Sequence, residues 1–152
     1  VDLNGKIKRL SGDEMGFAAR SSLLQSKSWI CVSAVLQLQE RDPKAIQAEM
    51  DDVSRKRKEK QPLELPSAGS VFKRPEGHFA GALIEQAGLK GYAIGGAQVS
   101  PKHAGFIVNT GDATCEDVVT LIHHIQKTVK EQFDVKLEPE IRYLTPYGLD
   151  RI

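Results

Sequence analysis

Residues 66–75 could hold a hydroxyl group beside positive charge, and this segment is the strongest candidate for a chemical site in the chain. It reads Pro-Ser-Ala-Gly-Ser-Val-Phe-Lys-Arg-Pro. Gly69 can adopt backbone angles that are closed to other residues, and the flanking prolines restrict the backbone on both sides. Ser70 would then be fixed close to Lys73 and Arg74. The spacing alone also fits a simpler interpretation, a turn that leads into a short strand.

Charged side chains in two other segments could bind an anion. Residues 55–60 read Arg-Lys-Arg-Lys-Glu-Lys and could bind phosphate groups, although the solvated end of a helix is the commoner explanation of such a run. Glu140 and Arg142 would lie on the same side of a strand, because side chains alternate along it. They could form an ion pair, or they could be an acid and a cation directed at one substrate carboxylate.

Composition argues against several classes of protein. The chain has 152 residues, of which 40% are hydrophobic and 27% charged, as in a folded globular protein. A net charge of +1, with no aromatic residues between the cations, argues against nucleic acid as a partner. No apolar run is long enough to span a membrane, and we see no signal-peptide pattern. Cys31 and Cys115 lack metal-ligand spacing, so we expect reduced thiols and a cytoplasmic protein.

Two further motifs do not indicate a metal or dinucleotide site. His123 and His124 are adjacent on an expected helix and point in different directions, so surface histidines explain them better than a metal pair. Gly95 and Gly96 lack the three-glycine spacing of a dinucleotide fingerprint. We therefore predict no metal site in this chain.

The elements expected in the first part of the chain are a hairpin, a long strand and a helix. Asn4-Gly5 is a strong hairpin signal between short apolar segments, with Leu3 and Ile7 in apolar contacts. Residues 29–38 are apolar on both faces, which predicts a strand in the middle of a sheet. Asp42-Pro43 then predicts the start of a helix that runs into the basic residues 55–60.

The second part is expected to contain a small sheet packed against helices. Thr114 and Asp117 resemble a capping box, and the apolar residues that follow recur at helical spacing, which predicts a helix over 115–132. The other expected elements are a short helix at 79–87, a strand at 92–99 that the glycine pair interrupts, a strand at 106–109, and a final strand at 135–144 with Pro139 at an edge or bulge.

The motifs of this chain resemble those of the UDP-N-acetylenolpyruvoylglucosamine reductases of bacterial peptidoglycan synthesis. The matching stretches are Phe17-x-x-Arg20-x-Ser22, Gln61-Pro62, Pro66-Ser67-Ala68-Gly69-Ser70-Val71-Phe72-Lys73, Ala80-Gly81-x-Leu83-Ile84, Gly88-Leu89-Lys90-Gly91, Ile94-Gly95-Gly96-Ala97, Lys102-His103-Ala104 and Leu137-Glu138-x-Glu140-Ile141-Arg142. They occur in the family's order. The resemblance implies a flavoprotein that contains FAD and takes electrons from NADPH. Its substrate would be UDP-N-acetylglucosamine enolpyruvate, reduced to UDP-N-acetylmuramate.

The resemblance also implies roles for individual residues. Ser70 would be the proton donor, Glu140 the second catalytic residue, and Arg20 a contact of the substrate carboxylate. The residues implied in substrate binding are Arg57, Lys58, Lys73, Arg74, Lys90, His103 and Arg142. Ala19 departs from the family pattern, which usually has tyrosine before the arginine, and Arg74 stands where asparagine is common.

The expected fold class is α+β in two unequal parts. Residues 1–61 would be the C-terminal part of a flavin-binding domain, and residues 62–152 a small substrate-binding domain. Because nothing in the chain resembles the N-terminal FAD-binding segments of the family, we expect those segments to be a missing partner. The chain alone would then bind little FAD and be inactive. A non-catalytic module that binds UDP-sugars is the alternative, and nucleic-acid binding would depend on residues 55–60 alone.

Overall fold

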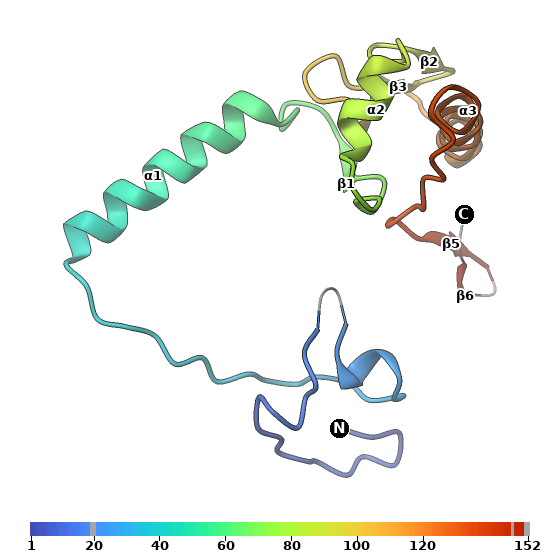
Figure 1. Cartoon of the computed structure of the whole chain (residues 1–152). Coiled ribbons are helices and arrows are strands. Elements are labelled where there is room, and N and C mark those ends of the chain that lie inside the picture. The colour runs from blue at the N-terminus through green and yellow to red at the C-terminus, as the bar shows by residue number, and fades with distance from the viewer. Residues whose placement is uncertain (19–20, 147, 151–152) are drawn as a thin grey trace. The chain divides into compact units, whose positions relative to one another are not determined.

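The computed structural model describes residues 1–18, 21–146 and 148–150, and its backbone divides into two compact units (Figure 1). The first unit is Val1–Asp42 and the second is Pro43–Ile152. The predicted division into domains at residues 61 and 62 stays a prediction. None of the described helices is both long and apolar enough to cross a lipid bilayer.

The first unit consists mainly of turns and extended segments. Its one described helix is the short 3-10 helix η1, Leu23–Gln25. The predicted turn at Asn4-Gly5 is present, since Asp2 Oδ1 accepts hydrogen bonds from the N–H groups of Asn4 and Lys6 at 3.0 and 2.9 Å. The flanking strands and their apolar contacts were predicted wrongly, because Leu3 and Ile7 are exposed. A turn alone cannot hold a hairpin without a surface on which its strands can pack.

The long strand predicted at 29–38 does not form in this chain. The segment has no regular secondary structure, and Val35 is 87% exposed. Near its start, the N–H of Ile30 donates to the carbonyl of Val1 at 2.8 Å. No described strand pairs with the rest of it. The prediction was wrong because β-branched residues favour a strand only where another strand and a packed face are available.

Helix α1, Pro43–Lys60, begins at Pro43 as predicted. Proline suits this first position because its missing N–H would have no partner inside the helix. The helix contains no buried residue, and its apolar residues Ile46, Met50 and Val53 are all exposed to solvent. Its stability must therefore come from helix propensity and ion pairs along its surface.

The second unit is organised around an antiparallel sheet with the strand order β1-β4-β3-β2. The strands are β1 Ser67–Ser70, β2 Ala93–Ile94, β3 Ala97–Val99 and β4 Phe106–Asn109. The prediction of one interrupted strand at 92–99 was wrong, because Gly95 and Gly96 form the turn of a hairpin between β2 and β3. Gly95 has φ 54°, a left-handed value that suits such a turn.

Helices α2, Ala80–Gln86, and α3, Cys115–Phe133, contact each other and contribute to one apolar core with the sheet. Both helices were predicted from the sequence. Thr114 and Asp117 form the capping box, with the Asp117 N–H donating to Thr114 Oγ1 at 3.1 Å. The fully buried residues of α3 are Leu121, Ile122, Ile125 and Val129. The core therefore lies between α3, α2 and the four-stranded sheet.

The final strand predicted at 135–144 was mostly wrong. Only its end is a strand, β5 Tyr143–Thr145, which forms a hairpin with β6 Gly148–Asp150. Pro139 takes part in an isolated bridge with Phe72, and the chain bends at Ile141. Proline cannot donate a ladder hydrogen bond, which limits pairing at this point to a short stretch.

Candidate active site

A β-bulge presents the hydroxyl-bearing residue Ser70 at the end of β1. Ser67 pairs with Val108 and Ser70 with Phe106, so β1 has one residue more than β4 between these two pairs. Gly69 lies inside the bulge with φ 88°, a conformation that L side chains rarely adopt. Bulges of this kind change the direction of the side chains that follow them. Gly69 and Ser70, which the sequence analysis singled out, therefore belong to a β-bulge, and Ser70 is exposed.

The segment that carries Glu140 runs alongside the residues after Ser70. The N–H of Lys73 donates to the carbonyl of Glu138 at 2.9 Å, and the N–H of Glu140 donates to the carbonyl of Val71 at 2.8 Å. Val71 is almost fully buried, which anchors this pairing to the core. Ser70 and Glu140 are seventy positions apart in sequence, yet they lie on neighbouring segments, and both are exposed.

Lys73 and Arg142, both predicted to bind substrate, lie beside the same pairing. Lys73 Nζ forms an ion pair with Glu138, which adds a side-chain link between the two segments. The predicted alternation that would place Glu140 and Arg142 on one face is interrupted by the bend at Ile141. Among the residues that the structure describes, Arg142 has no ion-pair partner.

His103 has a fixed orientation in the loop between β3 and β4. Its Nδ1 accepts the N–H of Gly105 at 3.0 Å, so the proton of the neutral ring lies on Nε2. The carbonyl of Gly105 in turn accepts the N–H of Val71 at 2.9 Å, which links this loop to the segment after Ser70. A Cβ atom at Gly105 or at Gly81 would lie 3.0 or 3.3 Å from the His103 ring. These two glycines therefore provide the space that the imidazole occupies.

Sequence reasoning missed a buried residue that supports this loop. The side chain of Ser100 is fully buried, and its Oγ accepts the N–H groups of Lys102 and His103 at 3.1 and 3.2 Å. A serine that precedes Pro-Lys-His is a typical turn residue, and this was the available signal. The burial could not be read from the sequence, because it depends on packing between distant elements.

Most of the remaining cations predicted to bind substrate contact other side chains of this chain. Lys90, in the loop after α2, forms an ion pair with Glu85 at 2.9 Å. Arg74 stacks on the ring of Phe79, with 4.0 Å from its Cζ to the ring centroid. On α1, Arg57 Nε donates to Gln61 Oε1 at 3.1 Å, and Lys58 has no ion-pair partner among the described residues.

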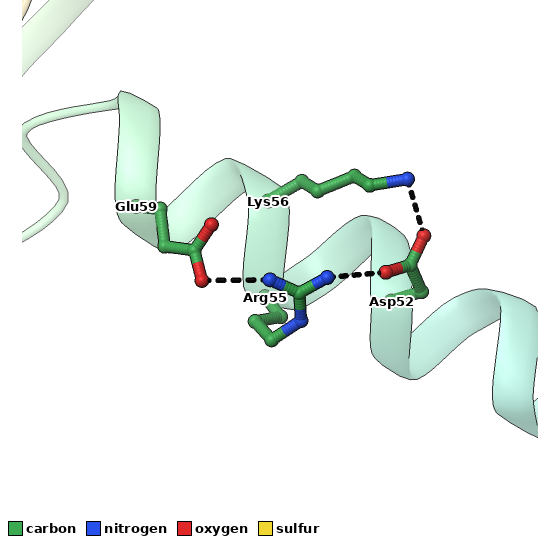
Figure 2. A network of polar contacts seen from close by, with 4 residues as sticks. All are labelled: Asp52, Arg55, Lys56 and Glu59. Carbon is green, nitrogen blue, oxygen red and sulfur yellow. Dashed lines mark hydrogen bonds and ion pairs between the residues drawn. The ribbon is translucent and has the colours of Figure 1, made fainter.

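Part of the basic run on α1 is neutralised by carboxylates of the same helix (Figure 2). Arg55 pairs with Asp52 at 2.6 Å and with Glu59 at 2.8 Å, and Lys56 also pairs with Asp52. The Lys56 ammonium and the Arg55 guanidinium hold the pKa of Asp52 below its ordinary value. Arg57 and Lys58, the cations named from the sequence, are outside this network and are the better candidates to bind an added anion.

Arg20, predicted as a catalytic residue, and Ala19, beside it, lie outside the described residues. The nearby described residues line a shallow hollow of ≈ 400 Å³ in the first unit. Its lining residues are Glu14, Met15, Gly16, Ser21, Ser22, Leu23, Gln25 and Ser26. Among the described residues, no group of histidine, cysteine and acidic side chains could hold a metal ion.

The space beside the glycine pair Gly95-Gly96 is occupied by the chain itself. A Cβ atom at Gly95 would lie 2.5 Å from the Asp117 carboxylate, and one at Gly96 would lie 2.2 Å from the carbonyl of Gly111. The start of α3 and the loop before it fill the space beside this turn. Gly95 and Gly96 therefore allow close packing within this unit.

Comparisons with known proteins agree with one another. A family model described as UDP-N-acetylenolpyruvoylglucosamine reductase, C-terminal domain, matches residues 61–144. The UDP-N-acetylenolpyruvoylglucosamine reductase of Caldanaerobacter subterraneus subsp. tengcongensis is 56% identical over 142 residues, which are 93% of this chain and 47% of that protein. The enzyme of the same name from Listeria welshimeri is 53% identical over 140 residues, 92% of this chain and 47% of that protein. The chain thus spans about half the length of these curated relatives.

A solved structure is also similar to this chain. The crystal structure of UDP-N-acetylenolpyruvylglucosamine reductase from Thermus caldophilus matches with a TM-score of 0.67 and 39% sequence identity. The match covers 84% of this chain and 46% of that one.

Proposed function

The chain belongs to the family of UDP-N-acetylenolpyruvoylglucosamine reductases and corresponds to its C-terminal region, and from this premise we propose that it supplies the substrate-binding half of such a reductase. The reaction would reduce the enolpyruvyl ether of UDP-N-acetylglucosamine to the lactyl ether, in peptidoglycan synthesis. The observation that carries the proposal is the placement of Ser70 on a bulge, beside the segment that holds Glu140.

Ser70 would donate the proton that completes the reduction. Addition of a hydride to the methylene carbon of the enolpyruvyl group leaves negative charge on the adjacent carbon, which the substrate carboxylate spreads as an enolate. The Ser70 Oγ–H would transfer its proton to that carbon, giving the lactyl ether. A serine hydroxyl is a weak acid, but it can protonate a far more basic carbon that is held next to it.

Glu140 and Arg20 would stabilise the charge that develops on the substrate carboxylate. Arg20 would do so as a cation, and Glu140, when protonated, as a hydrogen-bond donor. Preorganised donors act most strongly where charge appears only in the transition state. The backbone hydrogen bond from Glu140 to Val71 supports this role, because it fixes the start of the Glu140 side chain close to Ser70.

The cations of the second unit would bind the uridine diphosphate part of the substrate. Arg57, Lys58, Lys90 and His103 are implied in this role, with Lys73, Arg74 and Arg142 as further contacts. Charged donors form strong hydrogen bonds to phosphate oxygens. The orientation of His103 supports the proposal, because its neutral ring would present an Nε2–H donor.

FAD, reduced by NADPH, would supply the hydride when bound. Because none of the motifs of this chain resembles the N-terminal FAD-binding segments of the family, we assign flavin binding mainly to the half of the reductase that this chain does not match. The roles proposed for this chain are to bind the substrate, to orient it and to donate the proton.

The proposal is tested by joining the chain to the N-terminal half of the Caldanaerobacter reductase and changing Ser70. We expect Ser70→Ala to slow formation of the lactyl ether by about 10²–10⁴-fold, the usual contribution of a general acid. Ser70→Cys should retain more activity, because a thiol can still donate a proton. Reduction of the flavin by NADPH needs no substrate proton donor and should stay unchanged in both variants.

Ser54→Ala is a matched control, since Ser54 is an exposed serine in α1. It should leave the rate of product formation as it is. Equal rates for the Ser70→Ala variant and the unmodified protein would contradict the role of Ser70. If the Ser70 variants and the unmodified protein bind UDP-N-acetylglucosamine but none forms product, the alternative of a non-catalytic UDP-sugar-binding module would be favoured.

A further inference from the structure

A tight turn brings Arg74 and Phe79 together, just after the candidate active-site strand. The N–H of His78 donates to the carbonyl of Pro75 at 3.2 Å, which closes a turn over residues 75–78. Gly77, at the third position of the turn, has φ 70°, as a type II turn requires. The turn reverses the chain, so that the residue before it faces the residue after it.

The planar guanidinium of Arg74 lies over the aromatic ring of Phe79. Its Cζ is 4.0 Å from the ring centroid, well within the range of a cation–π contact. Arg74 Nε also donates to the carbonyl of His78 at 3.3 Å. The ring contact and this hydrogen bond together hold the guanidinium, and they restrict a side chain that would otherwise sample many rotamers.

The position of Phe79 is unusual for a large apolar residue. It is the N-cap residue of α2 but makes no side-chain cap hydrogen bond, and it is 63% exposed. Its neighbour in the chain, Ala80, is buried in the core. Burial therefore does not explain the aromatic ring at this position, whereas the stacked guanidinium does.

The arrangement leaves the outer edge of Arg74 available. Among the residues that the structure describes, Nη1 and Nη2 of Arg74 have no hydrogen-bond or ion-pair partner. This edge can donate parallel hydrogen bonds to an oxyanion such as a phosphate or a carboxylate. Lysine could not replace it, because an ammonium group neither stacks flat on a ring nor presents a fixed fork.

We propose that Phe79 is a positioning residue, which holds the Arg74 guanidinium so that its free edge binds an oxyanion of the substrate. The inference rests on the proposed function, because it takes the ligand to be the UDP-sugar substrate. The oxyanion is either the diphosphate or the enolpyruvyl carboxylate, since both present oxygens that fit the same fork. Phe79 itself does not contact the ligand.

The test measures binding of UDP-N-acetylglucosamine and of its enolpyruvyl ether to all 152 residues of this chain by calorimetry. We expect Phe79→Leu, which removes the ring face, to weaken binding about two- to fivefold, as befits an exposed cation–π contact. Phe79→Tyr should keep the affinity. If the affinity for both ligands falls, the oxyanion bound by Arg74 is the diphosphate. If only the affinity for the enolpyruvyl ether falls, it is the carboxylate.

A double-mutant cycle separates positioning from a merely structural role. Arg74→Ala should weaken binding about tenfold or more, since it removes charged hydrogen-bond donors. In that background, Phe79→Leu should have no further effect. The matched control is Trp29→Leu, which removes the ring under Lys8 in a second described cation–π pair, with 4.7 Å from Nζ to the ring centroid, and it should leave both affinities unchanged.

An NMR measurement reports on the stack without any ligand. Ring currents should shift the Arg74 Nε–H proton resonance upfield in the unmodified chain, and Phe79→Leu should abolish the shift. Unchanged affinities in Phe79→Leu, or a Phe79→Leu effect that persists in Arg74→Ala, would overturn the inference while leaving the proposed function intact. Lack of binding by the unmodified chain would overturn both.

Discussion

Both compact units contain strand-forming sequence, but only the second unit uses it in a buried sheet. In the first unit, Ile30, Val32 and Val35 belong to an apolar segment that is exposed and has no regular structure. In the second unit, Ile107 and Val108 form the buried strand β4 between β1 and β3. Both segments contain β-branched residues, which favour extended backbone. The difference is that β4 has a neighbouring strand on each edge and contributes Ile107 to the core that the sheet shares with α2 and α3.

The packed elements of the second unit are expected to fold cooperatively, because they share one core. The second unit has one core, to which the sheet, α2, α3 and the segment around Leu137 all contribute. The candidate active site is attached directly to that core, through Val71 and Phe72. Changes to this core should therefore alter the stability of the packed part of the second unit and of the site, whereas changes to the first unit should have local effects.

The largest difference between the units is expected for core truncation. Ile122 on α3 is 0% exposed, so Ile122→Ala should lower the free energy of unfolding by about 2–5 kcal/mol, through lost burial and a cavity. Val35→Ala, at an exposed position of the first unit, should change it by less than about 0.5 kcal/mol. Urea unfolding followed by circular dichroism measures both values. Equal losses would show that residues 29–38 also contribute to a cooperative core.

A smaller but still clear difference is expected for glycine substitution. A Cβ atom at Gly96 would lie 2.2 Å from the Gly111 carbonyl, so Gly96→Ala must displace the loop before α3. We expect a loss of about 1–3 kcal/mol, as for other overpacked sites.

Gly5→Ala is the counterpart in the first unit. Nothing lies within 4 Å of the added Cβ, although Gly5 has φ 79°. Its strain should remain local, so the thermal unfolding midpoint of the second unit should stay unchanged. A shared shift of the midpoint in both glycine variants would contradict the separation of the units.

The smallest expected effect concerns pH. Backbone and side-chain hydrogen bonds with Thr114 lower the pKa of Asp117 below its ordinary value. The folded protein then binds a proton less readily than the unfolded chain. The stabilisation is therefore complete above the ordinary aspartate pKa of about 3.9 and is lost as the pH falls through the lower, folded value.

Urea midpoints measured from pH 7 to pH 2 test this expectation. Asp117→Asn should be less stable than the unmodified chain at neutral pH, and the difference should shrink in acid. Asp2→Asn is the control, since Asp2 also accepts backbone hydrogen bonds but lies in the turn of the first unit. An unchanged difference across this pH range would argue against the Asp117 carboxylate as the source of the effect.

Local signals in the sequence were enough for much of the second unit. The capping box of Thr114 and Asp117 located the start of α3, and the helical spacing of apolar residues identified its buried face. Pro43 marked the start of α1. These features depend on residues within one or two helical turns, so the sequence contains the information needed to predict them. The motifs also indicated the family, which the comparisons confirm.

Tertiary structure alone decided which extended segments become strands and what surrounds the candidate site. Residues 29–38 and 135–144 were predicted as strands from composition, but pairing depends on partners that are often distant in sequence. Two features of the site join residues that are distant in sequence: the pairing of Glu140 with Val71, and the packing of His103 against Gly81. The contact of Arg74 with Phe79 depends on the turn between them. Residue types indicated which chemistry is available, and the packed core determined which of those residues meet.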